Sequence, residues 1–138
     1  MFDQTTIKTI LLAEDDGFVR RTIARMLERA GYHVLEARDG REALDQVCRN
    51  QGRIDLLFTD VMMPQLDGKR MADVAQALRP DLKVLYMSGF THRMIVIRGI
   101  LEPGLPFVNK ACSLSQMLAK VREMIEDSSA ALRDLSIG

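Results

Sequence analysis

Hydrophobic residues recur along this chain in two patterns that alternate from one end to the other. Short continuous apolar runs are typical of strands covered on both faces of a parallel sheet. They predict five strands, within residues 7–13, 33–37, 54–60, 83–87 and 107–109. Between the strands, apolar residues three and four positions apart predict helices around 19–30, 43–48, 68–78 and 114–125, with a less regular stretch at 91–101.

Residues with helix-capping chemistry stand where these predicted helices begin. Asp39 with Glu42, and Ser113 with Gln116, have the spacing of capping boxes. Asp16 is expected to cap the first helix or to face solvent. The buried stripes of the second and third helices are expected to contain Ala43, Leu44, Val47, Cys48, Met71, Val74, Ala75 and Leu78.

Strands that alternate with helices along the whole chain predict an α/β fold. Each crossover must be right-handed, so the strands become parallel and the helices cover both faces of the sheet. At this size we expect a flavodoxin-like three-layer sandwich, with five strands in the order 2-1-3-4-5 and five helices. Residues 1–127 form the expected domain, and residues 128–138 a tail or an extension of the last helix.

Composition and charge narrow the class of protein. The chain has 138 residues, enough for one domain, and is 47% hydrophobic. Its 19 basic and 19 acidic side chains cancel, so no direct binding to nucleic acid or to a membrane is expected. No apolar run reaches the length of a membrane-spanning helix, and the N-terminus lacks a secretory pattern. We expect a cytoplasmic protein, in which Cys48 and Cys112 are buried thiols rather than a disulfide.

Charged and polar residues follow directly after four of the predicted strands. Glu14 and Asp15 follow the first strand, Asp60 ends the third, Ser88 follows the fourth and Lys110 the fifth. The carboxyl ends of parallel strands share one edge of the sheet, so these side chains are expected to meet. Three carboxylates repel one another unless a cation joins them, which favours Mg²⁺, with Mn²⁺ as a second candidate. A carboxylate nucleophile, a lysine and a hydroxyl beside that metal form a phosphoryl-transfer set.

At these positions the chain resembles the response-regulator receiver domain of two-component signalling. The matching segments are LLAEDDGFVR, DLLFTDVMMPQLDG, VLYMSGF and FVNK, in order between Leu11 and Lys110. The resemblance covers nearly the whole chain and is closest in style to receivers of hybrid sensor histidine kinases. It leaves open whether the chain is a stand-alone regulator or a fragment of such a kinase.

The resemblance implies a role for each residue at the strand ends. Asp60 is implied as the phosphorylated aspartate. Asp15 is implied as a direct Mg²⁺ ligand, Glu14 as one acting mostly through water, and the backbone carbonyl of Met62 as a further ligand.

Ser88 and Lys110 are implied to bind the phosphoryl oxygens. Phe107 stands where the family keeps an aromatic residue that, together with the hydroxyl at position 88, switches on activation. The family usually follows this lysine with proline, often through a cis peptide, whereas Ala111 stands here. A cis bond before a residue other than proline costs about 3–4 kcal/mol, so we predict a trans Lys110–Ala111 bond and a rearranged loop.

The leading hypothesis is therefore a receiver that takes a phosphoryl group from a sensor histidine kinase or a histidine phosphotransfer protein. It would act as a signalling phosphoacceptor with self-catalysed phosphorylation and dephosphorylation, not as an enzyme in its own right. One alternative is a non-phosphorylated interaction module, which Ala111 mildly favours. A less favoured one is a Mg²⁺-dependent phosphatase with an aspartate nucleophile, whose sites resemble DxD, whereas position 62 is Met here.

The stretch MIVIRGIL, residues 94–101, is more apolar than one buried helix face needs. Either the fourth helix is short and irregular, because Gly99 weakens it, or its outer side is a surface for a partner. The stretch corresponds to the surface that receivers commonly use for dimerisation or output. A homodimer through the face between the fourth and fifth helices is therefore one expectation.

Overall fold

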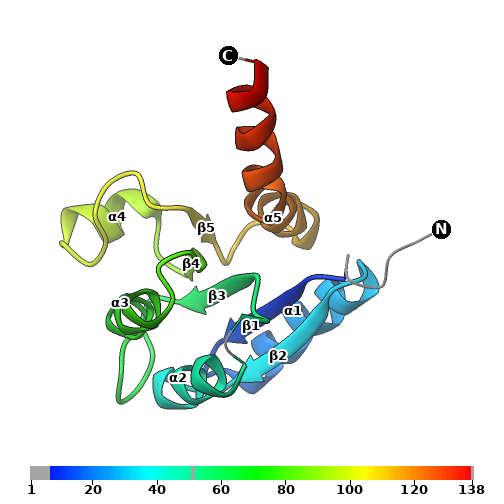
Figure 1. Cartoon of the computed structure of the whole chain (residues 1–138). Helices are drawn as coiled ribbons and strands as arrows, with labels where there is room; N and C mark the ends of the chain where they lie inside the picture. Colours follow the sequence, from blue (N-terminus) through cyan, green and yellow to red (C-terminus); the bar gives the residue numbers. More distant parts are fainter. Residues whose placement is uncertain (1–6, 51, 138) are drawn as a thin grey trace.

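The computed structural model describes residues 7–50 and 52–137, with side chains described as far as Glu126. Its centre is one parallel five-stranded sheet in the order β2-β1-β3-β4-β5, which confirms the predicted topology (Figure 1). The strands are β1 (Thr9–Ala13), β2 (His33–Ala37), β3 (Leu56–Asp60), β4 (Lys83–Ser88) and β5 (Phe107–Asn109). β1 begins two residues later than predicted, and Ile7 before it is exposed.

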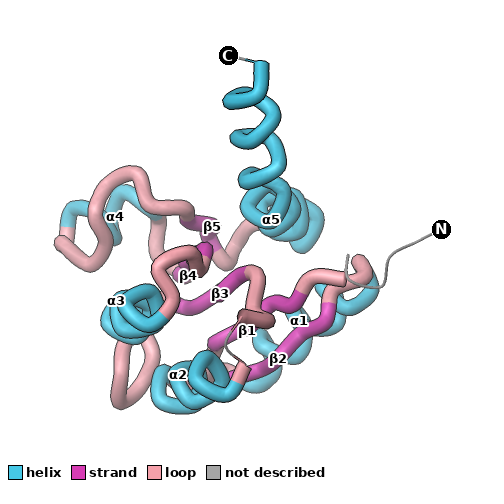
Figure 2. Tube along the Cα trace, viewed as in Figure 1, coloured by secondary structure: helices cyan, strands magenta, loops and turns pink. Residues whose placement is uncertain are grey.

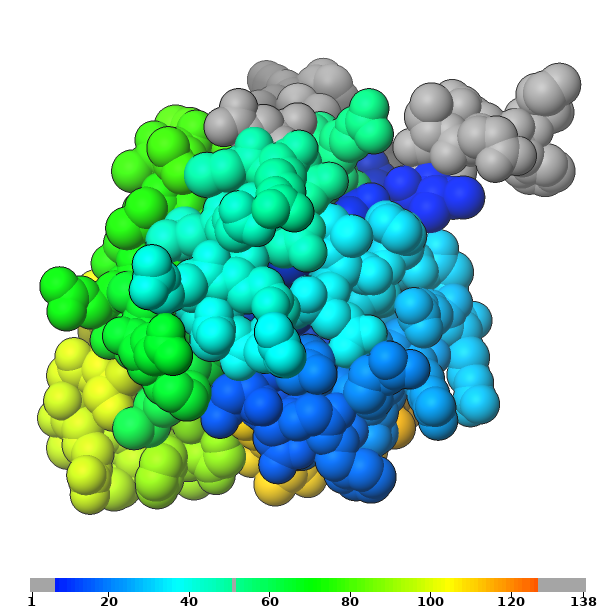
Figure 3. Space-filling view, turned by 90° about the horizontal axis from the view of Figure 1, so that it is seen from below, coloured from blue at the N-terminus to red at the C-terminus, as the bar shows by residue number. Residues whose placement is uncertain are grey.

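Helices cover both faces of the sheet, so the three-layer sandwich is confirmed as well (Figure 2). They are α1 (Gly17–Arg29), α2 (Gly40–Arg49), α3 (Gly68–Leu78), α4 (His92–Ile97) and α5 (Leu114–Ile137). One hydrophobic cluster joins α1 and α5 to the sheet, and a second joins α2, α3 and α4 to the other face. Figure 3 shows α2 and α3 side by side over that second face.

The central strands are apolar throughout because both of their faces are buried. Ile10 and Leu12 of β1 belong to the cluster with α1 and α5, whereas Leu11 and Ala13 belong to the cluster with α2, α3 and α4. Successive side chains of a strand point to opposite faces, so a strand between two helical layers needs apolar residues at every position.

The predicted caps are present, but the capping box predicted at α2 is incomplete, because Glu42 Oε1 accepts from Arg38 N–H and not from Asp39 N–H. Asp16 caps α1 by accepting hydrogen bonds from the N–H groups of Phe18 and Val19. Asp39 caps α2 through the N–H of Glu42, at 2.8 Å. At α5 the box is reciprocal, because Ser113 Oγ accepts from Gln116 N–H while Gln116 Oε1 accepts from Ser113 N–H, each at 3.0 Å. The box thus satisfies the N–H of the cap residue and one N–H of the first turn. For Asp16 the structure thus decides in favour of capping.

Two predicted stripes were wrong at their edges. The buried residues of α3 are Gly68, Met71, Ala72 and Ala75, whereas Val74 and Leu78 are exposed. In α2 the buried stripe is Gly40, Ala43 and Val47, which leaves Cys48 exposed instead of buried. Glycine lets each helix begin in close contact with a neighbour, since a Cβ would lie 1.8 Å from Asp60 O at position 68 of α3 and 2.4 Å from Leu66 O at position 40 of α2. Cys112 is partly buried, and both cysteines are free thiols.

The last two helices differ from ordinary ones in length. α4 has six residues and ends before Gly99, whose φ of 72° is a left-handed conformation that suits glycine. Its short, irregular form was one of the two predicted alternatives; Ile95 packs inward, whereas Met94 and Ile97 are exposed. α5 has 24 residues, and its C-terminal turns extend away from the sheet in Figure 1. Within residues 7–50 and 52–137, no helix combines the length and the apolarity needed to cross a membrane.

Candidate functional site

The register of the sheet brings the predicted site residues to one edge. Ala13 of β1 pairs with Thr59 of β3, and Ser88 of β4 pairs with Asn109 of β5, so these strands end at nearly the same level. The residues gathered there are the predicted ones: Glu14, Asp15, Asp60, Ser88 and Lys110. These residues are far apart in the sequence, and the parallel pairing of the strands is enough to bring them close together in space.

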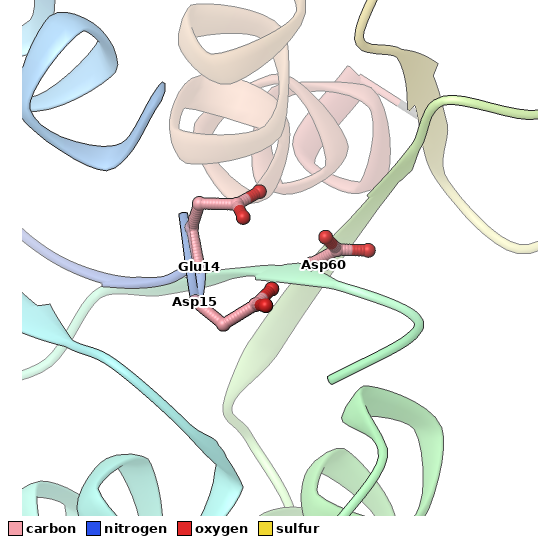
Figure 4. Close-up of side chains that lie close together, drawn as sticks. All are labelled: Glu14, Asp15 and Asp60. Carbon is pink, nitrogen blue, oxygen red and sulfur yellow. The ribbon is translucent and has the colours of Figure 1, made fainter. Parts of the chain in front are cut away.

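Three carboxylates converge at this edge (Figure 4). Glu14, Asp15 and Asp60 each contribute an oxygen, and these oxygens lie within 4.8 Å of one another. Glu14 is fully buried and Asp60 is 5% exposed, while Asp15 faces solvent. Buried carboxylates at such separations must be neutralised, either by a proton or by a nearby cation.

Lys110 supplies the positive charge that the structure places beside them. Its Nζ lies 2.5 Å from Asp60 Oδ2 and also contacts Glu14 Oε1. Burial raises the pKa of Glu14 from 4.5 to about 7, although the contacts with Lys110 and with Asp16 N–H act in the opposite direction. Burial alone would lower the pKa of Lys110, but its two carboxylate contacts outweigh burial and raise that pKa. The ammonium is therefore charged and shared between two acids.

The acidic pair after β1 is held by a residue that the sequence did not point out. Arg20 of α1 donates from Nη1 to the backbone oxygen of Glu14, at 2.9 Å, and from Nε to Glu36 Oε1, at 3.0 Å. The Glu14 side chain also accepts from Asp16 N–H through Oε2, at 2.9 Å. These contacts fix both the backbone and the carboxylate of Glu14. An arginine one turn into the helix after the acidic pair is the only sequence signal for this role.

Asp60 is fixed by the turn that follows β3. Its Oδ1 accepts from Met62 N–H at 3.0 Å, which keeps the backbone of Met62 beside the carboxylates. Gly68 closes the same turn, because its N–H donates to Val61 O at 2.7 Å. A Cβ at position 68 would lie 1.8 Å from the backbone oxygen of Asp60, so no larger residue fits. That the Met62 carbonyl binds a metal stays a prediction.

Ser88 and Phe107 lie on the neighbouring strands β4 and β5. Ser88 is buried, and its Oγ accepts from Phe90 N–H at 3.0 Å, which leaves its own hydroxyl proton available to a ligand. Phe107 is half-buried, and its ring lies 5.1 Å from that of His92 on α4. Phe107 therefore faces the α4 side and not the carboxylates. Its role as a switch stays a prediction.

The turn after Lys110 follows the prediction made from Ala111. No cis peptide bond occurs among the described residues, so the Lys110–Ala111 bond is trans. The Asn109 side chain shapes this turn: its Oδ1 accepts from Ala111 N–H at 2.7 Å, and its Nδ2 donates to Phe90 O at 3.1 Å. The sequence did not single out Asn109. Its signal is a carboxamide just before a lysine that no proline follows.

The donor set fits a hard divalent cation. The cluster has three carboxylates and one ammonium, which contacts two of them, so negative charge is in excess when all the acids are ionised. Glu14 Oε1 is buried without an aligned hydrogen bond among the described residues, although the Lys110 ammonium lies beside it. Oxygen ligands of this kind suit Mg²⁺ better than softer metals. Glu14, Asp15 and Asp60 are the side chains that could hold it.

Comparison with known proteins adds an independent finding. The family model described as "Response regulator receiver domain" matches residues 10–122. The chain is 34% identical over 118 residues to the sensor kinase CckA of Brucella abortus (strain 2308), which covers 86% of this chain but only 12% of that kinase. It is 42% identical over 84 residues to the response regulator receiver protein CpdR of the same organism, covering 61% of this chain and 68% of CpdR.

Solved structures of receiver domains are also similar to this chain. A crystal structure of the receiver domain from the hybrid histidine kinase CckA has a TM-score of 0.72 and 35% identity, covering 85% of this chain and 98% of that domain. A receiver domain from Clostridium thermocellum has a TM-score of 0.79 with 22% identity, covering 91% and 99%. Because the second structure is only 22% identical, its similarity supports the fold alone.

Proposed function

The chain belongs to the response regulator receiver family, the phosphoacceptors of two-component signalling, and from this premise we propose that Asp60 is its phosphoacceptor. The donor would be the phosphohistidine of a sensor histidine kinase or of a histidine phosphotransfer protein. The observation that carries the proposal is the position of Asp60, a carboxylate 5% exposed with the Lys110 ammonium 2.5 Å from its Oδ2.

The proposed reaction moves one phosphoryl group between two side chains. A carboxylate oxygen of Asp60 attacks phosphorus and the phosphorus–nitrogen bond of the donor breaks. The departing imidazole keeps the electron pair and takes up a proton from solvent. The product is an acyl phosphate on Asp60. Attack by water on the same phosphorus would return Asp60 and release phosphate, so the chain would also limit its own signal.

The neighbours of Asp60 would bind the transferred group. Lys110 would turn from the carboxylates to a phosphoryl oxygen, since a lysine ammonium is a compact positive charge suited to phosphate. Ser88 would donate its hydroxyl proton, which its present hydrogen bond from Phe90 leaves free. Both groups would stabilise charge on the phosphoryl oxygens.

Glu14, Asp15, Asp60 and the backbone carbonyl of Met62 would hold Mg²⁺. Bound there, Mg²⁺, or Mn²⁺ in its place, would neutralise charge on the carboxylates and on the phosphoryl oxygens. Arg20 supports this arrangement by fixing the backbone of Glu14.

The readout would be a change in partner binding. Movement of Ser88 and Lys110 toward the phosphoryl group would shift the loop between β4 and α4 and the end of β5. His92 begins α4 and Phe107 begins β5, so both rings would be affected. A homodimer through the α4–β5–α5 face is one such outcome, and the exposed Met94 and Ile97 on α4 support it. Ala111 favoured a non-phosphorylated interaction module, but here Lys110 still reaches Asp60.

The test uses phosphoramidate, which carries the phosphorus–nitrogen bond of a phosphohistidine, with and without Mg²⁺. Intact mass is measured for the wild type, for Asp60→Asn and for Asp45→Asn, an exposed aspartate of α2 away from the strand ends. The expected gain is one phosphate in the wild type and in Asp45→Asn, dependent on Mg²⁺, and none in Asp60→Asn. A gain in Asp60→Asn, or no gain in the wild type, would refute the proposal.

A further inference from the structure

Asn109 joins the two loops that flank the proposed phosphoryl site. It ends β5 and precedes Lys110 in the chain. Its side chain reaches Ala111 in the turn after β5 and Phe90 in the loop after β4. Ser88 is also part of this connection, because its Oγ accepts from Phe90 N–H. One side chain thus bridges the segments that carry the hydroxyl and the ammonium.

The chemistry of the carboxamide fits both contacts in one orientation only. Oδ1 accepts from Ala111 N–H at 2.7 Å, and Nδ2 donates to the backbone oxygen of Phe90 at 3.1 Å. Exchanging the two atoms would set a donor against a donor and an acceptor against an acceptor. Aspartate, serine or leucine at position 109 could not make both contacts.

The contact with Ala111 exists because residue 111 is not proline. Proline has no N–H, and its ring fixes φ near −65°, so it restrains a turn through covalent geometry. Alanine imposes no such restraint. Here its free N–H is taken by Asn109 Oδ1, while Cys112 N–H donates to Asn109 O at 3.0 Å. Asn109 thereby encloses Lys110 in a closed turn held by hydrogen bonds.

The direction of Lys110 depends on this turn. Its backbone N–H donates to Ser88 O at 2.8 Å, and its Nζ reaches Asp60 Oδ2 across the strand ends. The strand that carries it has only three residues. Asn109 is the last residue of this short strand and its side chain closes the turn beyond it, so its contacts largely determine where the Lys110 ammonium lies.

We propose that Asn109 is a positioning residue that holds Lys110 at Asp60, replacing with two hydrogen bonds the restraint that a proline after the lysine would supply. The proposal rests on the proposed function of Asp60 and Lys110. Asn109 itself does not contact the reacting atoms; it acts through Lys110 and through the loop of Ser88.

The test compares Asn109→Ala, the double variant Asn109→Ala with Ala111→Pro, and a matched control, Asn50→Ala. Asn50 also uses its carboxamide, donating to Gln46 O at the end of α2, away from the strand ends. The rate of phosphorylation by phosphoramidate is measured against donor concentration, well below the melting temperature of each variant. We expect Asn109→Ala to lower the rate at saturating donor about tenfold, which is less than the roughly 100-fold that a 1 Å misplacement of a catalytic group can cost.

The double variant should recover to within about threefold of the wild type, and Asn50→Ala should keep the wild-type rate whatever its melting temperature. A merely structural role would lower the melting temperature without changing the rate of the folded protein. A wild-type rate in Asn109→Ala, or no recovery in the double variant, would overturn the proposal.

A second readout does not depend on phosphorylation. The Lys110 N–H, which is bonded to Ser88 O, should exchange with solvent about tenfold faster in Asn109→Ala and return toward the wild type in the double variant. Unchanged exchange would overturn the proposal even where the rates agree with it. If the wild type is not phosphorylated while the exchange behaves as stated, the proposed function fails and the positioning of Lys110 by Asn109 stands.

Discussion

The carboxylate side and the lysine side of the site are built differently. The carboxylate side, with Glu14, Asp15 and Asp60, is carried by β1 and β3, which have five residues each and are buried along almost their whole length. The lysine side, with Lys110, is carried by β5, which has three residues of which only Val108 is buried. The first is fixed by packing on both faces of the sheet, and the second by a few side-chain hydrogen bonds.

The difference assigns separate tasks to the two sides. A cluster of three carboxylates loses its metal-binding geometry if its backbone moves, and a deeply packed strand resists movement. A residue that must follow a newly arrived phosphoryl group needs a support with two accessible arrangements, and short, sparsely packed elements provide one. Conformational change is therefore expected on the lysine side, in β5, α4 and the loops between them.

The largest expected effect on the free energy of unfolding comes from a substitution on the carboxylate side. Gly68→Ala would place a Cβ 1.8 Å from the backbone oxygen of Asp60, so the turn after β3 would have to move. We expect a loss of about 3 kcal/mol in the free energy of unfolding, the upper range for overpacking, measured by denaturant titration. The matched control is Gly89→Ala on the lysine side, where a Cβ would meet nothing within 4 Å. Equal losses in both variants would contradict the comparison.

The next largest effect is the dependence of the free energy of unfolding on pH, to which Glu14 contributes. Because burial raises the pKa of Glu14 from 4.5 to about 7, the folded protein binds this proton more tightly than the unfolded chain. Its contribution to the free energy of unfolding is therefore fully present below pH 4.5 and is lost as pH rises toward 7. Without divalent metal, Glu14→Gln should remove this loss and stabilise the protein by about 2 kcal/mol above pH 7.

The measurement is urea unfolding at pH 5 and pH 8 in a chelator, repeated with Mg²⁺. The matched control is Glu28→Gln, the same substitution at an exposed position of α1. Mg²⁺ should stabilise the wild type more than Glu14→Gln, because binding to the folded state alone adds to its stability. A wild type that becomes more stable from pH 5 to pH 8 relative to Glu14→Gln, without metal, would contradict the stated burial of this charge.

The two sides of the site also differ in how well the sequence predicts them. The carboxylate side was predictable because topology alone brings Glu14 and Asp60 together, and apolar runs identify buried strands. Which face of a helix is buried was not predictable. Periodicity gives the spacing of Val74 and Leu78, but it does not show that α3 buries the face with Gly68 and Ala72 instead. Neither Arg20 nor Asn109 could be assigned a role, because their side chains bond backbone groups of neighbouring loops and turns, and such contacts follow no periodic pattern.

The smallest expected effect lies on the lysine side. Thr91 caps the six-residue α4 by accepting from Met94 N–H at 3.2 Å, whereas Asp39 caps α2 through Glu42 N–H at 2.8 Å. Thr91→Ala should lower the free energy of unfolding by about 0.5 kcal/mol, and Asp39→Ala by about 1 kcal/mol, since the second bond is shorter and to a charged acceptor. Amide exchange should show the loss in Thr91→Ala confined to α4. If exchange instead rose throughout the sheet, α4 would unfold together with the core, and the lysine side would not be the separately movable part of the site.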